Sequence, residues 1–237
     1  MIRKSLSIVS VLVALLAFSS VASAQTVDEI VAKNLAAKGG LEKLKGIQTL
    51  RSTGSMSSQG RNVSVVFTSK RPNMTRQEIV MNGQTMLMVF DGTVARMINP
   101  MVSPTAVDMP SESLDMIKDQ SDIDGPLIDY KAKGSQIDFV STDTVEGKKV
   151  LHLRVRRKQM PEQDVFLDAT TYLEWKVTTT VPGSGVFETI FGDYRTVEGM
   201  TMPFSIKTLA AGMTVSEMKL DKIEVNIPLN DAVFKIK

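Results

Sequence analysis

Side chains suited to acid–base, nucleophilic or metal chemistry are sparse in this sequence. It contains no Cys, and His152 is its only histidine. In the stretch 151–155 this histidine alternates with apolar residues, which places it on the same strand face as Arg154 and Arg156. A catalytic triad or a histidine-based metal site needs partner residues that the sequence lacks. We therefore expect a surface histidine without a catalytic role.

Carboxylates provide the remaining candidates for chemistry. The run 122–125, Asp-Ile-Asp-Gly, resembles the start of a calcium loop, but the other ligand positions and the closing Glu are missing. Acids far apart in sequence, such as Asp129 and Asp138, can assemble into a hydrolase site, and shifted pKa values in a shared cleft would then identify them. No phosphate-binding loop or dinucleotide fingerprint occurs. The sequence predicts no enzyme, no metal and no cofactor.

The first 24 residues have the three parts of a secretory signal. Arg3 and Lys4 precede the apolar run 8–18, and a small-residue cleavage site ends at Ala24. This segment holds two of the 28 basic residues and none of the 26 acidic ones, so residues 25–237 are formally neutral. A neutral chain lacks the basic face that nucleic acid requires. We expect residues 1–24 to be a signal peptide and residues 25–237 to be one exported domain.

The stretch from Lys70 to Pro100 predicts three consecutive antiparallel strands, over 73–81, 84–90 and 94–98. Asn82-Gly83 and Asp91-Gly92 separate them, and such pairs favour two-residue hairpins because both residues tolerate positive φ. The middle strand is apolar on both faces, with Met86, Met88 and Phe90 on one and Leu87 and Val89 on the other. Such a strand is covered on both sides. A helix or an acyl chain would supply one cover.

Methionine is the compositional anomaly, since eight of the 15 lie between Met74 and Met116. Met is flexible and polarizable, and it fills cores as well as surfaces that re-pack around varied apolar shapes. A deformable apolar cavity between sheet and helices is therefore one interpretation, and ordinary core packing is the other.

Elsewhere the sequence predicts a few helices and many short strands. Thr26 and Glu29 fit a capping box that begins an amphipathic helix, which Gly39-Gly40 ends. A central helix should contain Leu114, Met116 and Ile117, after an irregular segment over 101–110. Further strands are expected at 48–56, 62–70, 136–145, 148–157, 163–168, 173–181, 186–194, 202–209 and 213–225. The fold class is α+β: a large, curved, barrel-like antiparallel sheet with the N-terminal and central helices on its concave face.

Three short motifs follow one another in the first half of the chain: Arg-Pro-Asn at 71–73, Asp-Gly at 91–92 and Asn-Pro at 99–100. In this order they resemble the LolA family of periplasmic carriers of outer-membrane lipoproteins. Residues 191–195, Phe-Gly-Asp-Tyr-Arg, and the closing 230–234 are similar to the broader lipoprotein-sorting group. The resemblance implies a half-barrel closed by helices over a cavity for acyl chains, with Arg71 holding the lid. Aromatic residues that follow the Asp-Gly turn in the carrier are replaced here by Arg96, Met97 and Ile98.

The resulting hypothesis is a non-catalytic carrier of lipid or lipoprotein acyl chains, acting as a monomer. An inner-membrane release complex and an outer-membrane acceptor are the partners that the family implies. The alternative is an envelope-stress sensor or assembly factor of the same fold that binds a protein. The residues expected to line the lipid cavity are Val65, Phe67, Met74, Met86, Met88, Phe90, Met97, Leu114, Met116 and Ile117. Which strand face lines it depends on register, which one bulge can invert.

Overall fold

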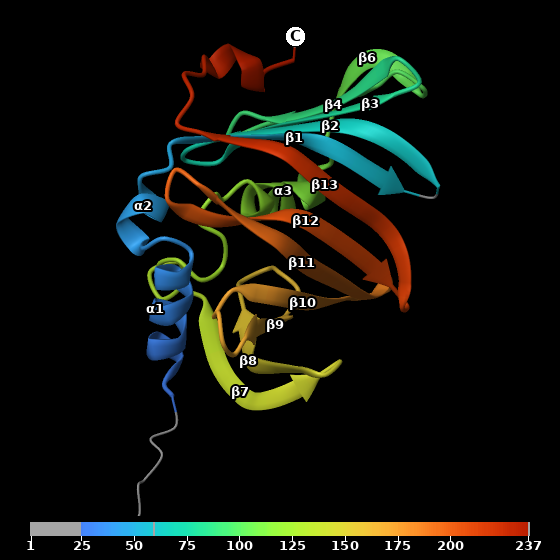
Figure 1. The fold of residues 1–237 in the computed structure, drawn as a ribbon. Helices are drawn as coiled ribbons and strands as arrows, with labels where there is room; N and C mark the ends of the chain where they lie inside the picture. Colours follow the sequence, from blue (N-terminus) through green and yellow to red (C-terminus); the bar gives the residue numbers. More distant parts are fainter. Residues whose placement is uncertain (1–24, 59, 237) are drawn as a thin grey trace, which may run out of the picture.

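The computed structural model describes residues 25–58 and 60–236, so the expected signal peptide lies outside the described residues. Within them, all strands form a single antiparallel sheet of 13 strands that curves around an open side (Figure 1). Its order is β6-β5-β4-β3-β2-β1-β13-β12-β11-β10-β9-β8-β7, so two hairpin meanders join through the pair β1–β13. The predicted α+β class, a curved sheet with helices on its inner side, is confirmed. None of the described helices is long and apolar enough to cross a membrane.

The first six strands and the first two helices come from the N-terminal half of the chain. Their bounds are α1 Val27–Ala37, α2 Leu41–Lys45, β1 Thr49–Ser58, β2 Arg61–Lys70, β3 Met74–Met81, β4 Gln84–Phe90, β5 Ala95–Asn99 and β6 Ser103–Asp108. The short 3₁₀ turn η1 and helix α3 follow. The remaining elements are η1 Ser111–Ser113, α3 Leu114–Gln120, β7 Gln136–Val145, β8 Lys148–Arg156, β9 Gln163–Asp168, β10 Glu174–Val181, β11 Gly185–Val197, β12 Met200–Ala210, β13 Met213–Val225 and η2 Asp231–Phe234.

Local sequence signals explain most of these boundaries. Thr26 accepts a hydrogen bond from the N–H of Glu29, whose carboxylate accepts one from the N–H of Thr26, which confirms the capping box. After α1 the chain turns at Gly39, where φ is +115° and an added Cβ would lie 2.6 Å from the carbonyl oxygen of Gly199. Glycine is therefore required where this turn meets the β11–β12 hairpin.

The two hairpins predicted between 73 and 98 differ. Asn82 and Gly83 have φ of +52° and +76°, as a two-residue turn requires. The prediction for Asp91-Gly92 was wrong, because a four-residue loop joins β4 to β5. Asp91 accepts hydrogen bonds from the N–H groups of Thr93 and Val94, at 3.0 and 2.9 Å. The bond from Val94 is the main cause that lowers the pKa of Asp91. Its side chain thus organises the loop.

The segment 101–110 was also predicted wrongly, because it contains the edge strand β6. Pro104 lies in this strand. Pro104 has no N–H to donate, but an edge strand pairs on one side only, so the missing donor costs nothing on its open side.

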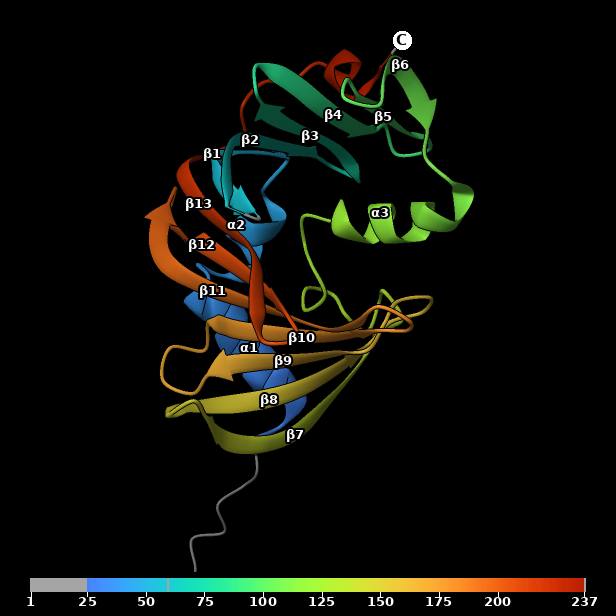
Figure 2. The same cartoon turned by 90° about the vertical axis from the view of Figure 1, so that its right-hand side faces the viewer.

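The lower half of the sheet in Figure 1, which comprises β7 to β10, encloses a packed core. Helix α1 lies alongside β7 to β9 (Figures 1 and 2), and its Ile30 and Val31 pack against the inner faces of β8 and β9. Leu153 and Leu167 there are fully buried. Leu127, from the segment after α3, completes this cluster.

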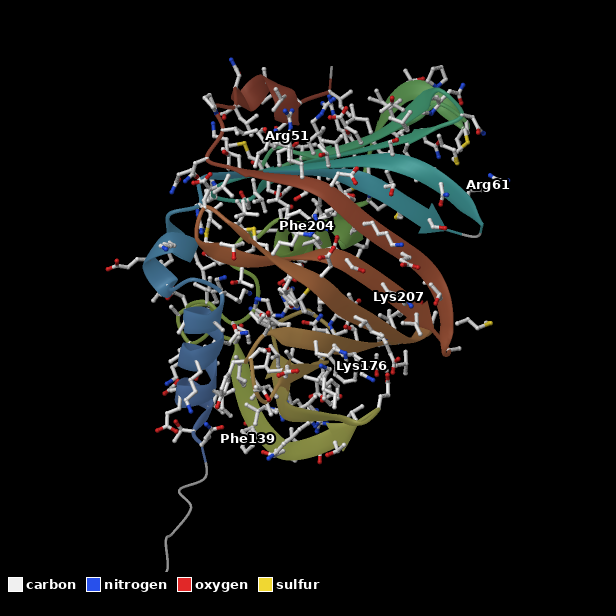
Figure 3. All side chains as sticks on the ribbon, viewed as in Figure 1. Arg51, Arg61, Phe139, Lys176, Phe204 and Lys207 are labelled. Atoms are coloured by element: carbon white, nitrogen blue, oxygen red, sulfur yellow. The ribbon has the colours of Figure 1, made fainter. Side chains whose placement is uncertain are left out.

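The upper half of the sheet comprises β1 to β6 and β11 to β13. The C-terminal segment lies on its outer face. Phe234 of η2 is fully buried and shares a small cavity wall with Val89 of β4. Arg76 and Arg96 donate to the carbonyl oxygens of Val233 and Ile236, both at 3.0 Å. Figure 3 shows Arg51, on the same outer face, beneath this segment. This segment therefore supplies the outer cover that the doubly apolar strand β4 requires.

Candidate functional site

The inner face of the upper half carries cross-strand rows of apolar side chains. Paired residues of adjacent antiparallel strands point to the same side, so the register defines each row. One row is Met97, Met88, Gln77, Phe67, Ser52 and Ile223. The next is Met86, Ile79, Val65, Gly54 and Leu220. A third is Val63, Met56, Met218, Ile206 and Phe191. We call this surface the inner apolar face.

Much of the inner apolar face is only half covered. Nine of its apolar side chains have intermediate burial: Met56, Phe67, Ile79, Met86, Met88, Met97, Phe191, Ile206 and Met218. Helix α3 lies across the opening of the sheet (Figure 2), and its Ile117 packs against Phe90 and Ala95. The face therefore combines large apolar groups with remaining access, which is the property of a site for apolar ligands.

The structure brings most of the predicted cavity residues together. Phe67, Met86, Met88 and Met97 lie half-buried on the inner apolar face, and Val65 lies buried among them.

Around α3, Phe90 is buried against Ile117, and Leu114 packs on the same cluster. One placement was wrong. Met74 pairs with Lys70, whose ammonium contacts the C-terminal segment, so Met74 lies on the outer face. Met116 lies on α3 with 48% of its surface exposed, and its place in the cavity stays a prediction.

Arg71 joins three parts of the chain at one end of this face. Its guanidinium donates to the carbonyl oxygens of Ile47 and Leu44 and makes a two-pronged ion pair with Asp124, with Nη1 2.9 Å from Oδ2. The two side chains are 20% and 12% exposed. Hydrogen bonding to Arg71 lowers the pKa of Asp124 despite the opposing effect of burial. This pair ties the segment after α3 to β2 and α2.

Sequence reasoning missed Asp124 as the partner of Arg71, and it missed the contributions of β11–β13 to the face. Asp124 belongs to the run that resembled a calcium loop, yet its carboxylate is bound to Arg71 and that of Asp122 is bound to Lys133. Ile206 and Met218 alternate with polar residues in predicted strands, a signal that was present, whereas Phe191 stands between Ile190 and Gly192. Only the pairing of these strands with β1 places them on this face.

Two cavities lie beside α3. The larger, of about 480 Å³, is lined by residues of α3, of the β8–β9 loop and of the β2–β3 turn, and by Asp122 and Lys133. The smaller, of about 280 Å³, is lined partly by Val165, Val177 and Phe191 of the sheet. Both cavities include Asp119 and Asp122 in their walls, so they adjoin.

The other chemistry-bearing residues do not meet in a common cleft. Asp129 pairs with Lys45 and Asp138 with Arg156, both at 2.6 Å, on different parts of the fold. Among the described residues, no group of three or more His, Asp or Glu side chains is placed to hold a metal ion.

The surface position expected for His152 was wrong. Its side chain is 12% exposed, stacks on Phe166 at 4.5 Å and lies 2.8 Å from Asp164. Phe166 and Asp164 come from the adjacent strand β9, so the neighbours of the histidine are set by tertiary pairing rather than by its own strand.

Comparison with known proteins defines the fold. No family model and no curated protein sequence matches the chain. Among solved structures, it is similar to an outer membrane lipoprotein-sorting protein domain from Vibrio parahaemolyticus, at 12% identity and a TM-score of 0.61, over 87% of this chain and 94% of that one. A DUF1329 family protein from Desulfovibrio piger has 14% identity and a TM-score of 0.62, over 90% and 98%.

A third similar structure is a LolA superfamily protein from Nitrosomonas europaea, with 12% identity and a TM-score of 0.60, over 90% of this chain and 99% of that one. The sheet and helices of this chain therefore form a LolA-like fold. At these identities the likeness concerns architecture alone, and one architecture serves many functions. Function has to be argued from the inner apolar face.

Proposed function

We propose that this protein is a carrier that binds acyl chains of lipids or lipoproteins on its inner apolar face, without catalysing a reaction. The half-covered state of this face is the observation that supports the proposal. Each CH₂ group moved from water onto it contributes about 0.8 kcal/mol, so one or two acyl chains can bind without a strong polar anchor.

Helix α3 and the segment that follows it act as the lid in this proposal. Entry of a chain between α3 and the sheet requires Ile117 to separate from Phe90 and Ala95, which it contacts in the closed form. The Arg71–Asp124 pair then acts as the latch, because it fixes the far end of the same segment. A carrier with this latch binds when the lid opens and retains its cargo when the lid closes.

The proposal includes export to the periplasm, with a signal peptide at residues 1–24 cleaved after Ala24 and one domain over residues 25–237. It further includes action as a monomer between an inner-membrane release complex and an outer-membrane acceptor. N-terminal sequencing of the protein isolated from periplasm tests the cleavage site, and a mature chain that begins at Gln25 is expected.

Native mass spectrometry of this isolated protein, with lipid extraction of the same sample, tests the function. Bound acyl species are expected, and their masses identify the cargo class. A protein that is empty, and stays empty after incubation with phospholipid and with lipoprotein, would overturn the proposal. A stoichiometric protein partner without lipid would instead favour the sensor or assembly factor.

Two variants in neighbouring strands locate the binding surface. Met88→Glu places a carboxylate on the inner apolar face, where burying it against an acyl chain is costly, so acyl binding should fall by at least tenfold. Val80→Glu places the same group on the outer face, since Val80 pairs with Ser64 and is 39% exposed. It should leave acyl binding unchanged. Equal binding by both variants would show that the face is assigned wrongly.

A further inference from the structure

The larger cavity beside α3 is lined by charged side chains that have ion-pair partners and by others that have none among the described residues. Asp122 is bound by Lys133, and Asp119 is bound by Arg157. Lys118 and Lys158 also line this cavity, from α3 and from the β8–β9 loop. Neither ammonium forms an ion pair or a hydrogen bond with any of the residues described. Asp115 also lines the cavity and likewise has no ion pair or hydrogen bond with any of the described residues.

The position of this cavity relates it to the acyl site. It adjoins the smaller cavity, which reaches Phe191 of the inner apolar face. It also lies on the polar side of α3, whereas Ile117 on the other side of the helix contacts the sheet. A ligand that reaches from the larger cavity into the smaller one would therefore pass from lysine side chains to apolar side chains. Such a ligand is amphiphilic, with an anionic end.

We propose that the cavity of about 480 Å³ binds the phosphate of a lipid headgroup through Lys118 and Lys158. The inference rests on the proposed function, and it narrows the cargo from acylated molecules in general to phospholipids. Phosphate oxygens accept charge-assisted hydrogen bonds from ammonium groups, which are stronger than bonds between neutral groups. Inorganic phosphate has the same chemistry, and the experiment separates the two sources.

The experiment measures binding of two probes to the full mature protein: phosphatidylglycerol and diacylglycerol with identical acyl chains, each in detergent micelles. The wild type should bind phosphatidylglycerol at least tenfold more tightly than diacylglycerol. Lys118→Gln and Lys158→Gln should each remove much of this preference while leaving diacylglycerol binding unchanged. Asp115→Asn removes a negative charge from the same cavity and should strengthen phosphatidylglycerol binding. Lys219→Gln, at a lysine whose side chain is 70% exposed on β13, is the control and should have no effect.

The outcomes distinguish this inference from the proposed function. Binding of neither lipid would overturn the carrier function itself. Equal binding of both lipids, unaffected by the lysine variants, would overturn the headgroup site and leave the carrier in place. Inorganic phosphate that binds in the absence of lipid, with an affinity equal to that of phosphatidylglycerol, would assign the cavity to the free anion and overturn the headgroup site as well.

Discussion

The two halves of this sheet use their inner faces differently. In the lower half, α1 and Leu127 cover the inner side of β8 and β9, and Leu153 and Leu167 are fully buried. In the upper half, Ile117 of α3 packs against Phe90 and Ala95, and the surrounding Met and Phe side chains stay half-exposed. One continuous sheet therefore has a sealed half and an open half.

Side-chain type follows this difference. The sealed half is packed with Leu, Val and Ile, whose branched side chains have restricted rotamers and pack at high density. The open half is rich in Met, whose flexible thioether adapts to irregular shapes. This contrast favours a rigid scaffold in the lower half and an adaptable binding surface in the upper half. Five predictions test it, from the largest expected effect to the smallest.

Phe234→Ala tests whether the C-terminal segment is the outer cover of the open half. The side chain is fully buried over β3 and β4, so truncation should lower the free energy of unfolding by about 3–5 kcal/mol. Urea denaturation followed by circular dichroism measures this. Lys235→Ala, at an exposed neighbour, should have little effect. A Phe234 variant as stable as the wild type would show that the open half does not need an outer cover.

Leu153→Ala tests the sealed half. Truncation leaves a cavity among the apolar neighbours of Leu153, such as Ile30 and Val165, so the free energy of unfolding should fall by about 2–5 kcal/mol. The folded variant should bind acyl chains as the wild type does, because its substitution lies outside the inner apolar face. Val140→Ala, on the edge strand β7 and 45% exposed, is the stability control. Loss of acyl binding by folded Leu153→Ala would contradict the division into two halves.

Asp124→Asn tests the latch between the halves. It leaves the guanidinium of Arg71 without a charged partner and should cost about 1–3 kcal/mol. Amide hydrogen exchange over residues 114–128 should accelerate more than exchange in β8, because the pair holds the lid segment rather than the core. Asp129→Asn removes a more exposed pair with Lys45 and should change exchange much less. Unchanged exchange over 114–128 would contradict the latch.

The Arg71–Asp124 ion pair should weaken at acidic pH. The pKa of Asp124 is lowered in the folded protein, chiefly by hydrogen bonding to Arg71. Its contribution to stability is therefore complete above the unfolded-state pKa of about 4 and is lost as pH falls through the lower folded-state pKa. The protection of amides 114–128 against exchange, relative to the intrinsic exchange rate at each pH, should fall below about pH 4 in the wild type. Asp124→Asn should lack this part of the pH dependence.

Much of the fold was predictable because its signals are local. The capping box at Thr26 and Glu29, the turn at Asn82-Gly83 and the alternation along each strand are set by residues close in sequence. The apolar character of β4 on both faces even predicted two covers. It did not identify the outer one, because Phe234 lies far along the chain from Val89 and only tertiary packing brings them together.

The site was less predictable, because its residues are far apart in sequence and come together only in the tertiary structure. Arg71 was identified through a resemblance, but its partner Asp124 is 53 residues away in sequence. Met74 was grouped with the other methionines by hydrophobicity, whereas its pairing with Lys70 places it on the outer face. Pro104 suggested irregular structure, and only the sheet order shows that its strand lies at an edge. That the inner apolar face binds lipid stays a prediction.

Met97→Ala has the smallest expected effect on stability and separates binding from folding most directly. Met97 is half-buried beside Met88 on the inner apolar face, so its truncation should cost about 1 kcal/mol or less of unfolding free energy. Acyl binding should weaken about fivefold, because the side chain contributes apolar area to a bound chain. Lipid titration and urea denaturation of the same preparation measure both quantities. A large loss of stability with unchanged binding would mean that the open half is an ordinary core, and the contrast between the halves would then disappear.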